Sequence, residues 1–183
     1  LTGRPEIIYY EKGDSVSPYH LVSDLLRRFG PDSIVAVGRV RLWRDSLTVT
    51  SDSLFHNLGP GISYFRGGPP LVQDPKFNLR GAEIDVQAAQ RKLQRVTALG
   101  SARGEFRPDS TLAAADSITA GPAQAGSWIT GDTLDLYFGA SGIDSLASSG
   151  GSRSYFRESA ESGVNYILGR WIKLVWENGV VER

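Results

Sequence analysis

The feature that most constrains the fold of this chain is an internal repeat. The segment at residues 79–86 (LRGAEIDV) returns at residues 129–136 (ITGDTLDL), 50 positions further on. The same spacing brings Gly100 onto Gly150. Two segments and the gap between them are therefore preserved together, which predicts a chain built from a repeated pair of segments.

The first segment of each pair has the pattern small-Asp-Ser/Thr-aliphatic. The second has the pattern aliphatic-x-x-aliphatic-x-small-x-Gly, and an aromatic-arginine pair closes it a few residues later. Copies of the first segment occur at residues 51–54, 115–118 and 131–134, and residues 169–172 fit the same slot without the aspartate. The aromatic-arginine pairs are Trp43-Arg44, Phe65-Arg66, Phe106-Arg107 and Phe156-Arg157.

Each segment has the alternation of a β-strand. Leu134, Leu136 and Phe138 alternate with polar or outward residues, which puts one apolar face inward. Ile129 and Leu134 are an odd number of positions apart, so the alternation changes parity at the small-Asp step. We therefore expect a bend or bulge there that re-aims the strand.

Two regions leave alternatives open. Residues 18–29 have the caps of an amphipathic helix, but residues 23–26 also occupy the place where the repeat needs a first segment, and we favour a strand. Residues 57–76 are rich in glycine and proline, which predicts a loop-rich insert with one short strand around residues 62–65. The fold class is all-β, with at most one short helix near 18–29.

Composition narrows the function classes. Lys plus Arg is 20 and Asp plus Glu is 20, so the formal net charge is zero, which weighs against a nucleic-acid partner. There is no cysteine and no apolar run long enough to cross a bilayer as a helix. The chain begins with leucine and contains no methionine, and we read it as an excised piece of a longer protein.

Catalytic and metal-binding patterns are weak. The two histidines, His20 and His56, stand far apart, and no nucleophile or nucleotide-binding motif accompanies them. Asp52, Asp116 and Asp132 recur once per unit, which is typical of residues that cap backbone amides at strand bends rather than of a calcium loop. We therefore predict no enzyme activity, no metal and no cofactor.

In their order and pairing, the segments at 37–42, 47–54, 79–86, 91–100 and 129–134 resemble the OstA-like (LptA-like) family of periplasmic lipopolysaccharide-transport proteins. The resemblance covers most of residues 32–183. It implies a single domain over residues 1–183, an open β-jelly roll of stacked two-strand repeats whose interior holds acyl chains. It also implies a periplasmic protein, in the soluble space or associated with the outer membrane, that binds lipopolysaccharide or a related lipid. Its ends would pair edge to edge with other jelly-roll domains of a transport bridge.

The alternation nominates the residues that would line such a lumen: Val49, Leu54, Ile84, Val86, Val96, Ile118, Leu134, Leu136, Phe138, Leu146, Ile172, Leu174 and Trp176. The arginines after aromatic residues are candidates for contacting phosphates at its rim: Arg44, Arg66, Arg107 and Arg157. The alternative is a structural or interaction β-repeat module of the cell envelope with a fully packed core. The two readings differ in whether the inward side chains line a cavity or touch one another.

Overall fold

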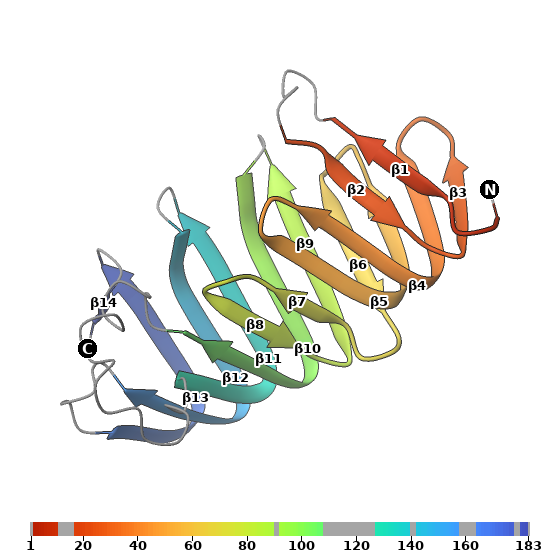
Figure 1. Ribbon diagram of the computed structural model, residues 1–183. Helices are drawn as coiled ribbons and strands as arrows, with labels where there is room; N and C mark the ends of the chain where they lie inside the picture. Colours follow the sequence, from red (N-terminus) through yellow and green to blue (C-terminus); the bar gives the residue numbers. More distant parts are fainter. Residues whose placement is uncertain are drawn as a thin grey trace, which may run out of the picture.

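In a computed structural model, the chain folds into strands stacked side by side (Figure 1). The structure describes residues 2–10, 17–89, 92–107, 127–139, 142–157, 164–177 and 180–182. Within these residues there is no helix, and so none long and apolar enough to cross a membrane. The all-β class is therefore confirmed. The strands are β1 (Glu6–Tyr9), β2 (Tyr19–Val22), β3 (Leu25–Phe29), β4 (Ser33–Arg44), β5 (Leu47–Asn57), β6 (Ile62–Arg66), β7 (Leu71–Gln73), β8 (Phe77–Arg80), β9 (Glu83–Ala89), β10 (Lys92–Phe106), β11 (Ser127–Gly139), β12 (Gly142–Arg157), β13 (Val164–Glu177) and β14 (Val180–Glu182).

The helix that the caps around residues 18–29 suggested is not present. Two antiparallel partners of β4, the strands β2 and β3, occupy this region instead, as the repeat predicted. The helical reading required Phe29 to share a buried face with Leu26, but Phe29 is 56% exposed and Leu26 is 3% exposed. Pairing with β4 overrides the local helix signals because it satisfies the backbone groups of both strands and buries Leu26.

The glycine- and proline-rich region at 57–76 holds more strand than its composition indicated. The short strand expected around residues 62–65 is β6, and a second strand, β7, follows the run Gly67-Gly68-Pro69-Pro70. β6 pairs with the second half of β5, and β7 pairs with the first half of β5. The region is therefore a strand interrupted by a tight corner, in register with its neighbours.

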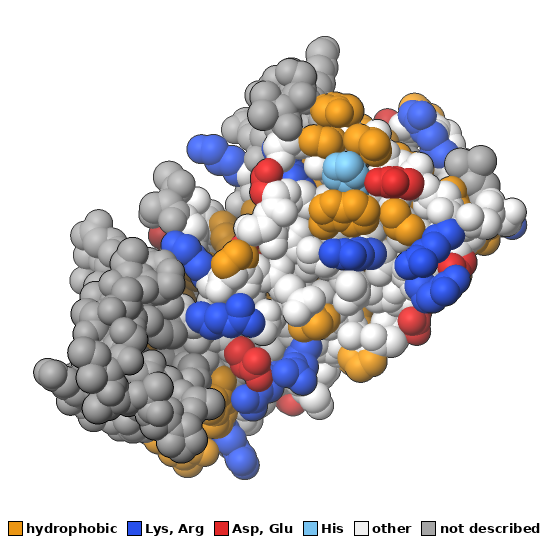
Figure 2. All heavy atoms as spheres, in the orientation of Figure 1, with side chains coloured by type: hydrophobic (Ala, Val, Ile, Leu, Met, Phe, Trp, Pro, Cys, Tyr) orange, Lys and Arg blue, Asp and Glu red, His pale blue; other side chains and the backbone are white. Residues whose placement is uncertain are grey.

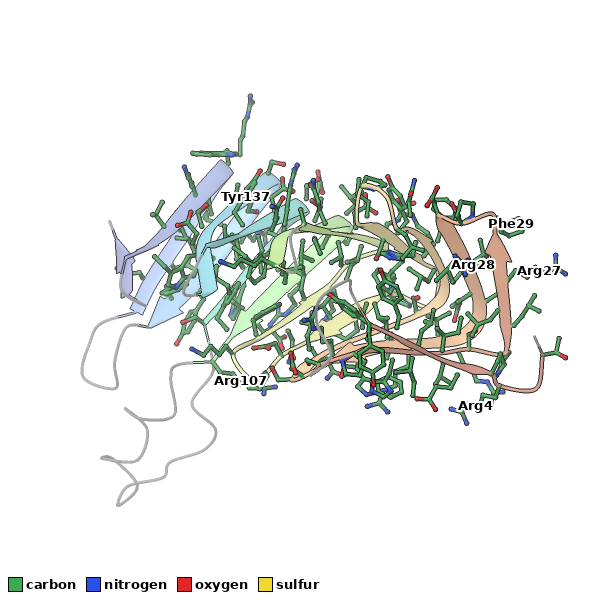
Figure 3. The ribbon with its side chains drawn as sticks, turned by 90° about the horizontal axis from the view of Figure 1, so that it is seen from above. Arg4, Arg27, Arg28, Phe29, Arg107 and Tyr137 are labelled. Carbon is green, nitrogen blue, oxygen red and sulfur yellow. The ribbon has the colours of Figure 1, made fainter. Side chains whose placement is uncertain are left out.

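Bends lie at the small-Asp and glycine positions of the repeat, as the parity change predicted. The register shifts between Val37 and Val40 in β4, Leu99 and Ala102 in β10, Thr130 and Thr133 in β11, and Ser149 and Ser152 in β12. The strand bends at each shift, and its two halves lie in two facing parts of one continuous sheet (Figure 3).

Consecutive residues with positive φ lie at the bends in β4, β10 and β12 and at the corner between β6 and β7. The pairs are Gly38-Arg39, Gly67-Gly68, Gly100-Ser101 and Gly150-Gly151. The first residue of every pair is glycine, the residue that adopts positive φ without steric cost. Backbone hydrogen bonds close the corners from the neighbouring segment: the amides of Asp24, Asp52 and Ala82 donate to the carbonyls of Gly38, Gly67 and Gly100 at 2.8, 3.1 and 3.0 Å.

The bends divide the strands between two facing half-sheets. Half-sheet A contains β3, β6, β9 and β14 with one half of each long strand, and half-sheet B contains β1, β2, β7 and β8 with the other halves. Hydrogen bonding closes a ring through β5, β6, β9, β10, β8 and β7, which forms a β-barrel core that the remaining strands extend on either side. In Figure 3 the side chains fill the space between the half-sheets, with Tyr137 outside half-sheet A and Arg107 outside half-sheet B.

Candidate ligand cavity

Inner-face residues form continuous rows across the strands, because cross-strand partners point to the same side of a sheet. In half-sheet B one row consists of mutually paired residues from β1 to β11: Ile7, Leu21, Leu42, Val49, Val72, Leu79, Gly104 and Ile129. All but Gly104 are apolar and branched. The inner faces of the two half-sheets together form one hydrophobic core.

A cavity of about 370 Å³ lies between the half-sheets in the N-terminal part of the fold. On the side of half-sheet B its walls come from β1, β2, β8 and the adjoining halves of β4 and β5. On the side of half-sheet A they come from β6, β9, β10, β11 and the other halves of β4 and β5. It reaches the strand tips away from the bends, where Leu47, Leu58 and Leu93 line it. Its volume falls within the range of about 300–1,000 Å³ that is typical of small-molecule pockets.

Small side chains leave this space open. Gly61, Ser63 and Ala88 line the cavity on half-sheet A, whereas Phe65 and Ile84 fill the adjacent row and are fully buried. Gly61 cannot be enlarged, because a Cβ there would lie 2.0 Å from the carbonyl oxygen of Ala88. The sequence therefore maintains the space through residues that lack bulk.

Arg44 provides the positive charge at the cavity. It lies at the end of β4, its guanidinium carbon is 4.7 Å from the centre of the Tyr19 ring, and its side chain is only 15% exposed. Its Nε is 3.8 Å from Asp45 Oδ2, a loose ion pair compared with the 2.7 Å between Arg66 and Asp85. The ring of Tyr19 thus holds a cation beside an apolar space.

The residues nominated for the lumen lie in the core, with one outside the described residues. Nine are buried: Val49, Leu54, Ile84, Val96, Leu134, Leu136, Leu146, Ile172 and Leu174. Val86, Phe138 and Trp176 are partly buried against these nine. Ile118 lies outside the part of the chain that the structure describes. Only Val49, Leu54, Val86 and Phe138 line the cavity.

The other nominated residues lie where side chains touch one another. Beyond Val96, the inner row continues through Leu136, Leu146 and Leu174, which are at most 5% exposed. The rings of Phe106 and Trp176 approach to 5.8 Å at this end. The fold therefore combines a cavity near its N-terminal part with a packed interior near its C-terminal part.

The four rim arginines do not share one environment. Arg44 lines the cavity, whereas Arg66 is on the outer surface, bonded to Glu83 at 3.0 Å and to Asp85 at 2.7 Å. Arg107 lies just past β10 and is exposed (Figure 3). Arg157 ends β12, and its side chain is not among those described. Of the three described side chains, Arg44 alone is placed to meet a ligand in the cavity.

Sequence reasoning missed much of the cavity wall. Tyr19, Leu42, Leu47, Ala88 and Leu93 line it but were not nominated. Leu42 and Leu47 lie on either side of the short turn between β4 and β5. Ala88 and Leu93 are cross-strand partners near the end of β9 and the start of β10. Extending the period-two alternation to the strand tips would have found them.

Charges of both signs lie on the face drawn in Figure 2, and several of the charged groups of the protein form ion pairs, among them Arg39 with Asp24, Arg80 with Glu105 and Arg95 with Asp135. The hydrogen bond from Arg103, reinforced by the charges of Arg103 and Arg80, lowers the pKa of Glu105. The Asp135 carboxylate accepts hydrogen bonds from Arg95 and raises the pKa of that arginine. Among the described residues, no three His, Cys, Asp or Glu side chains are grouped as metal ligands.

A comparison with models of known families, and with curated proteins, finds no match to the chain.

Proposed function

We propose that the chain is an open β-jelly roll of stacked two-strand repeats that binds the acyl chains of lipopolysaccharide or a similar envelope lipid. The observation that carries the proposal is the apolar cavity of about 370 Å³ between the two half-sheets. The repeated bends support the architecture, because each turns one strand through both half-sheets and stacks it on the next. A repeat pair cannot bury its apolar face alone, so neighbours must stack.

The energetics of the cavity favour an aliphatic ligand. Apolar side chains such as Leu21, Leu42, Val49 and Leu54 make up most of its walls, and the polar side chains Asp45, Ser46 and Asp74 also line it. Moving a methylene group from water into such surroundings contributes about 0.8 kcal/mol, so an acyl segment of several methylenes gains enough to be retained. The tips of the strands, where Leu58 and Leu93 lie, are the natural entrance.

Arg44 fits an anionic headgroup. A guanidinium binds phosphate or carboxylate oxygens through paired hydrogen bonds. Its side chain is largely withdrawn from water, and a cation in such a place interacts more strongly with an anion than one at a screened surface does. An acyl chain in the cavity would bring the phosphate or carboxylate at its end close to this group.

Unpaired strand edges at the two ends support docking to other β-domains. Within the described residues, β3 pairs with β4 and has one isolated bridge, between Leu25 and Thr2, on its other edge. The first half of β13 pairs only with β12 in this part of the chain. Tyr166, Ile167 and Leu168 on that half of β13 are 54%, 42% and 63% exposed. Exposed apolar edges are sites for strand addition. The proposal therefore includes edge-to-edge pairing within a periplasmic bridge that passes lipid toward the outer membrane.

A second candidate is a structural β-repeat module of the cell envelope, and the packed interior beyond Val96 favours it. There Leu134, Leu136 and Leu146 have no exposed surface. A lumen continuous from end to end would need these side chains to move apart. The two candidates make different predictions for the N-terminal cavity, where the module needs no ligand.

Native mass spectrometry of the protein after incubation with lipopolysaccharide tests the choice. We expect a bound lipid mass for the wild type and its loss in Ala88→Trp, which would fill the cavity from β9. Gln87→Trp is the matched control, because Gln87 is the exposed neighbour on the same strand. Lipid binding to Ala88→Trp at the wild-type level, or no binding to the wild type, would overturn the proposal in favour of the structural module.

A further inference from the structure

One inner-face row in half-sheet A is apolar except at two adjacent positions. Following the cross-strand partners from β4 to β13, the row consists of Ile34, His56, Ser63, Val86, Val96, Leu136, Leu146 and Leu174. The neighbouring row passes through Leu54 and Phe65 on the same two strands and is apolar there. The neighbouring row has one polar member, Ser148 on β12, whose hydroxyl is hydrogen-bonded to the Thr130 carbonyl and to Ser152. Within these two rows, two adjacent polar positions therefore occur only at His56 and Ser63.

This polar pair coincides with the cavity. His56 and Ser63 are direct cross-strand partners, and His56 Nδ1 lies 2.8 Å from Ser63 Oγ. Both residues line the cavity, and Ser63 is 5% exposed. Where the same row continues away from the cavity, from Val96 onward, it contains only valine and leucine.

An apolar pair would stabilise this position of the sheet at least as well. The Ser63 hydroxyl must lose water to enter the interior, and its hydrogen bond with His56 does little more than offset that loss. Polar groups placed in an otherwise apolar ligand site are what fix the orientation and identity of the ligand. The pair therefore points to a ligand with a polar atom of its own at this depth.

The chemistry of the pair selects a hydroxyl group. If the serine hydroxyl donates to His56 Nδ1, its oxygen can still accept a hydrogen bond; if His56 Nδ1–H donates to the serine, the serine hydroxyl can donate to the ligand. A ligand hydroxyl is both donor and acceptor, so it suits either tautomer of His56. An ester carbonyl suits only the second. Neither a plain methylene nor a methyl group can use the pair.

We infer that His56 and Ser63 form a subsite for a hydroxyl group carried part-way along an aliphatic chain. The subsite gives the cavity specificity for hydroxylated acyl chains over unsubstituted ones. The inference rests on the proposed function, because it requires an acyl chain to enter the cavity. It differs from the role of Arg44, which lies in half-sheet B and meets the anionic end of the ligand.

The test compares stearic acid with monohydroxylated stearic acids that differ in hydroxyl position, by displacement of a fluorescent fatty acid from the protein. The carboxylate is common to all probes, so only the hydroxyl is tested. At least one hydroxylated probe should bind the wild type about fivefold more tightly than stearic acid, as a single neutral hydrogen bond would give.

Two variants isolate the pair. His56→Leu/Ser63→Ala replaces both partners and should remove the preference while stearic acid still binds. Ser63→Ala alone is a smaller change and should also remove the preference. It serves as the test if the double variant does not fold. Ser53→Ala is the matched control: its hydroxyl donates to the Arg66 carbonyl at 3.2 Å on the outer side of β5, and the preference should persist.

The outcomes separate the two claims. Equal affinity of the wild type for all probes, or a preference that survives in a folded Ser63→Ala, overturns the subsite and leaves the lipid cavity standing. Failure of every probe to bind the wild type overturns both.

Discussion

The bend at Gly150 offers a direct test of how the repeat turns its strands. Gly150 and Gly151 both have positive φ, 79° and 62°, so alanine strains either position. They differ in their surroundings. A Cβ on Gly150 would lie 2.5 Å from Asp132 Cβ, whereas a Cβ on Gly151 would meet nothing within 4 Å. The same substitution at neighbouring positions therefore separates backbone strain from steric contact.

The expected losses of unfolding free energy follow from these contacts. Gly151→Ala should cost about 1–2 kcal/mol, the penalty of a left-handed conformation for a residue with a Cβ. Gly150→Ala carries the same penalty plus about 1–3 kcal/mol of overpacking, because Asp132 Cβ is fixed to the backbone and cannot rotate away. Adding Asp132→Gly removes the opposing side chain and should return the cost of Gly150→Ala to about that of Gly151→Ala, a coupling that a double-mutant cycle measures.

Urea unfolding followed by tryptophan fluorescence and by circular dichroism provides the assay. The midpoint should shift without a change in slope if the variants alter stability alone. Equal losses for Gly150→Ala and Gly151→Ala, or no coupling between position 150 and Asp132, would refute the reasoning that the two facing segments of the repeat are in steric contact at the bend.

Three further predictions concern the core, the surface and the cavity. Leu136→Ala, at a fully buried position, should lower the free energy of unfolding by about 2–5 kcal/mol in the same urea assay. The pKa of Glu105 is lowered in the folded state, so its ion pairs with Arg103 and Arg80 stabilise the protein above the ordinary pKa of 4.5 and lose that contribution as pH falls through the lower folded value. Glu105→Gln should therefore show a shallower loss of stability across that acidic range. Arg44→Gln should weaken binding of a phosphate- or carboxylate-bearing lipid by about tenfold, while an uncharged acyl alcohol binds as before.

A specific result would contradict each of these three predictions. A loss under about 1 kcal/mol for Leu136→Ala would mean that the C-terminal interior is loosely filled. An unchanged acid profile for Glu105→Gln would place the carboxylate outside the ion pairs. Equal effects of Arg44→Gln on charged and uncharged lipids would mean that Arg44 acts by shape rather than by charge.

The internal repeat allowed much of the strand arrangement to be predicted from the sequence. The parity change between Ile129 and Leu134 predicted the bend in β11, and the repeat register predicted strands at 18–29 against the local helix signals. These successes have one physical cause, since hydrogen bonding between neighbouring layers imposes the same spacing on each copy. The strand β7 was not predicted, because two prolines follow Gly67-Gly68 and the glycine- and proline-rich composition of this region indicated a loop.

The cavity was harder to predict from the sequence, because the alternation of apolar and polar residues identifies the inner face of a strand but not the distance between opposite walls. Leu136 and Val86 belong to the same inner row, yet only Val86 lines the cavity. The difference arises from the small residues Gly61 and Ala88 beside Val86, which the repeat pattern treats like any other position. The contact between Gly150 and Asp132 was hidden for the same reason, since it depends on how closely two layers approach.

Photo-crosslinking in cells tests the central claim most directly. A photoreactive phenylalanine analogue replaces Leu93, which lines the cavity, or Gln87, which is exposed on the adjacent strand. Illumination should attach lipopolysaccharide to the protein through position 93 and leave position 87 unmodified. Equal adducts at both positions, or an adduct at 87 alone, would contradict the claim that the lipid occupies the space between the half-sheets.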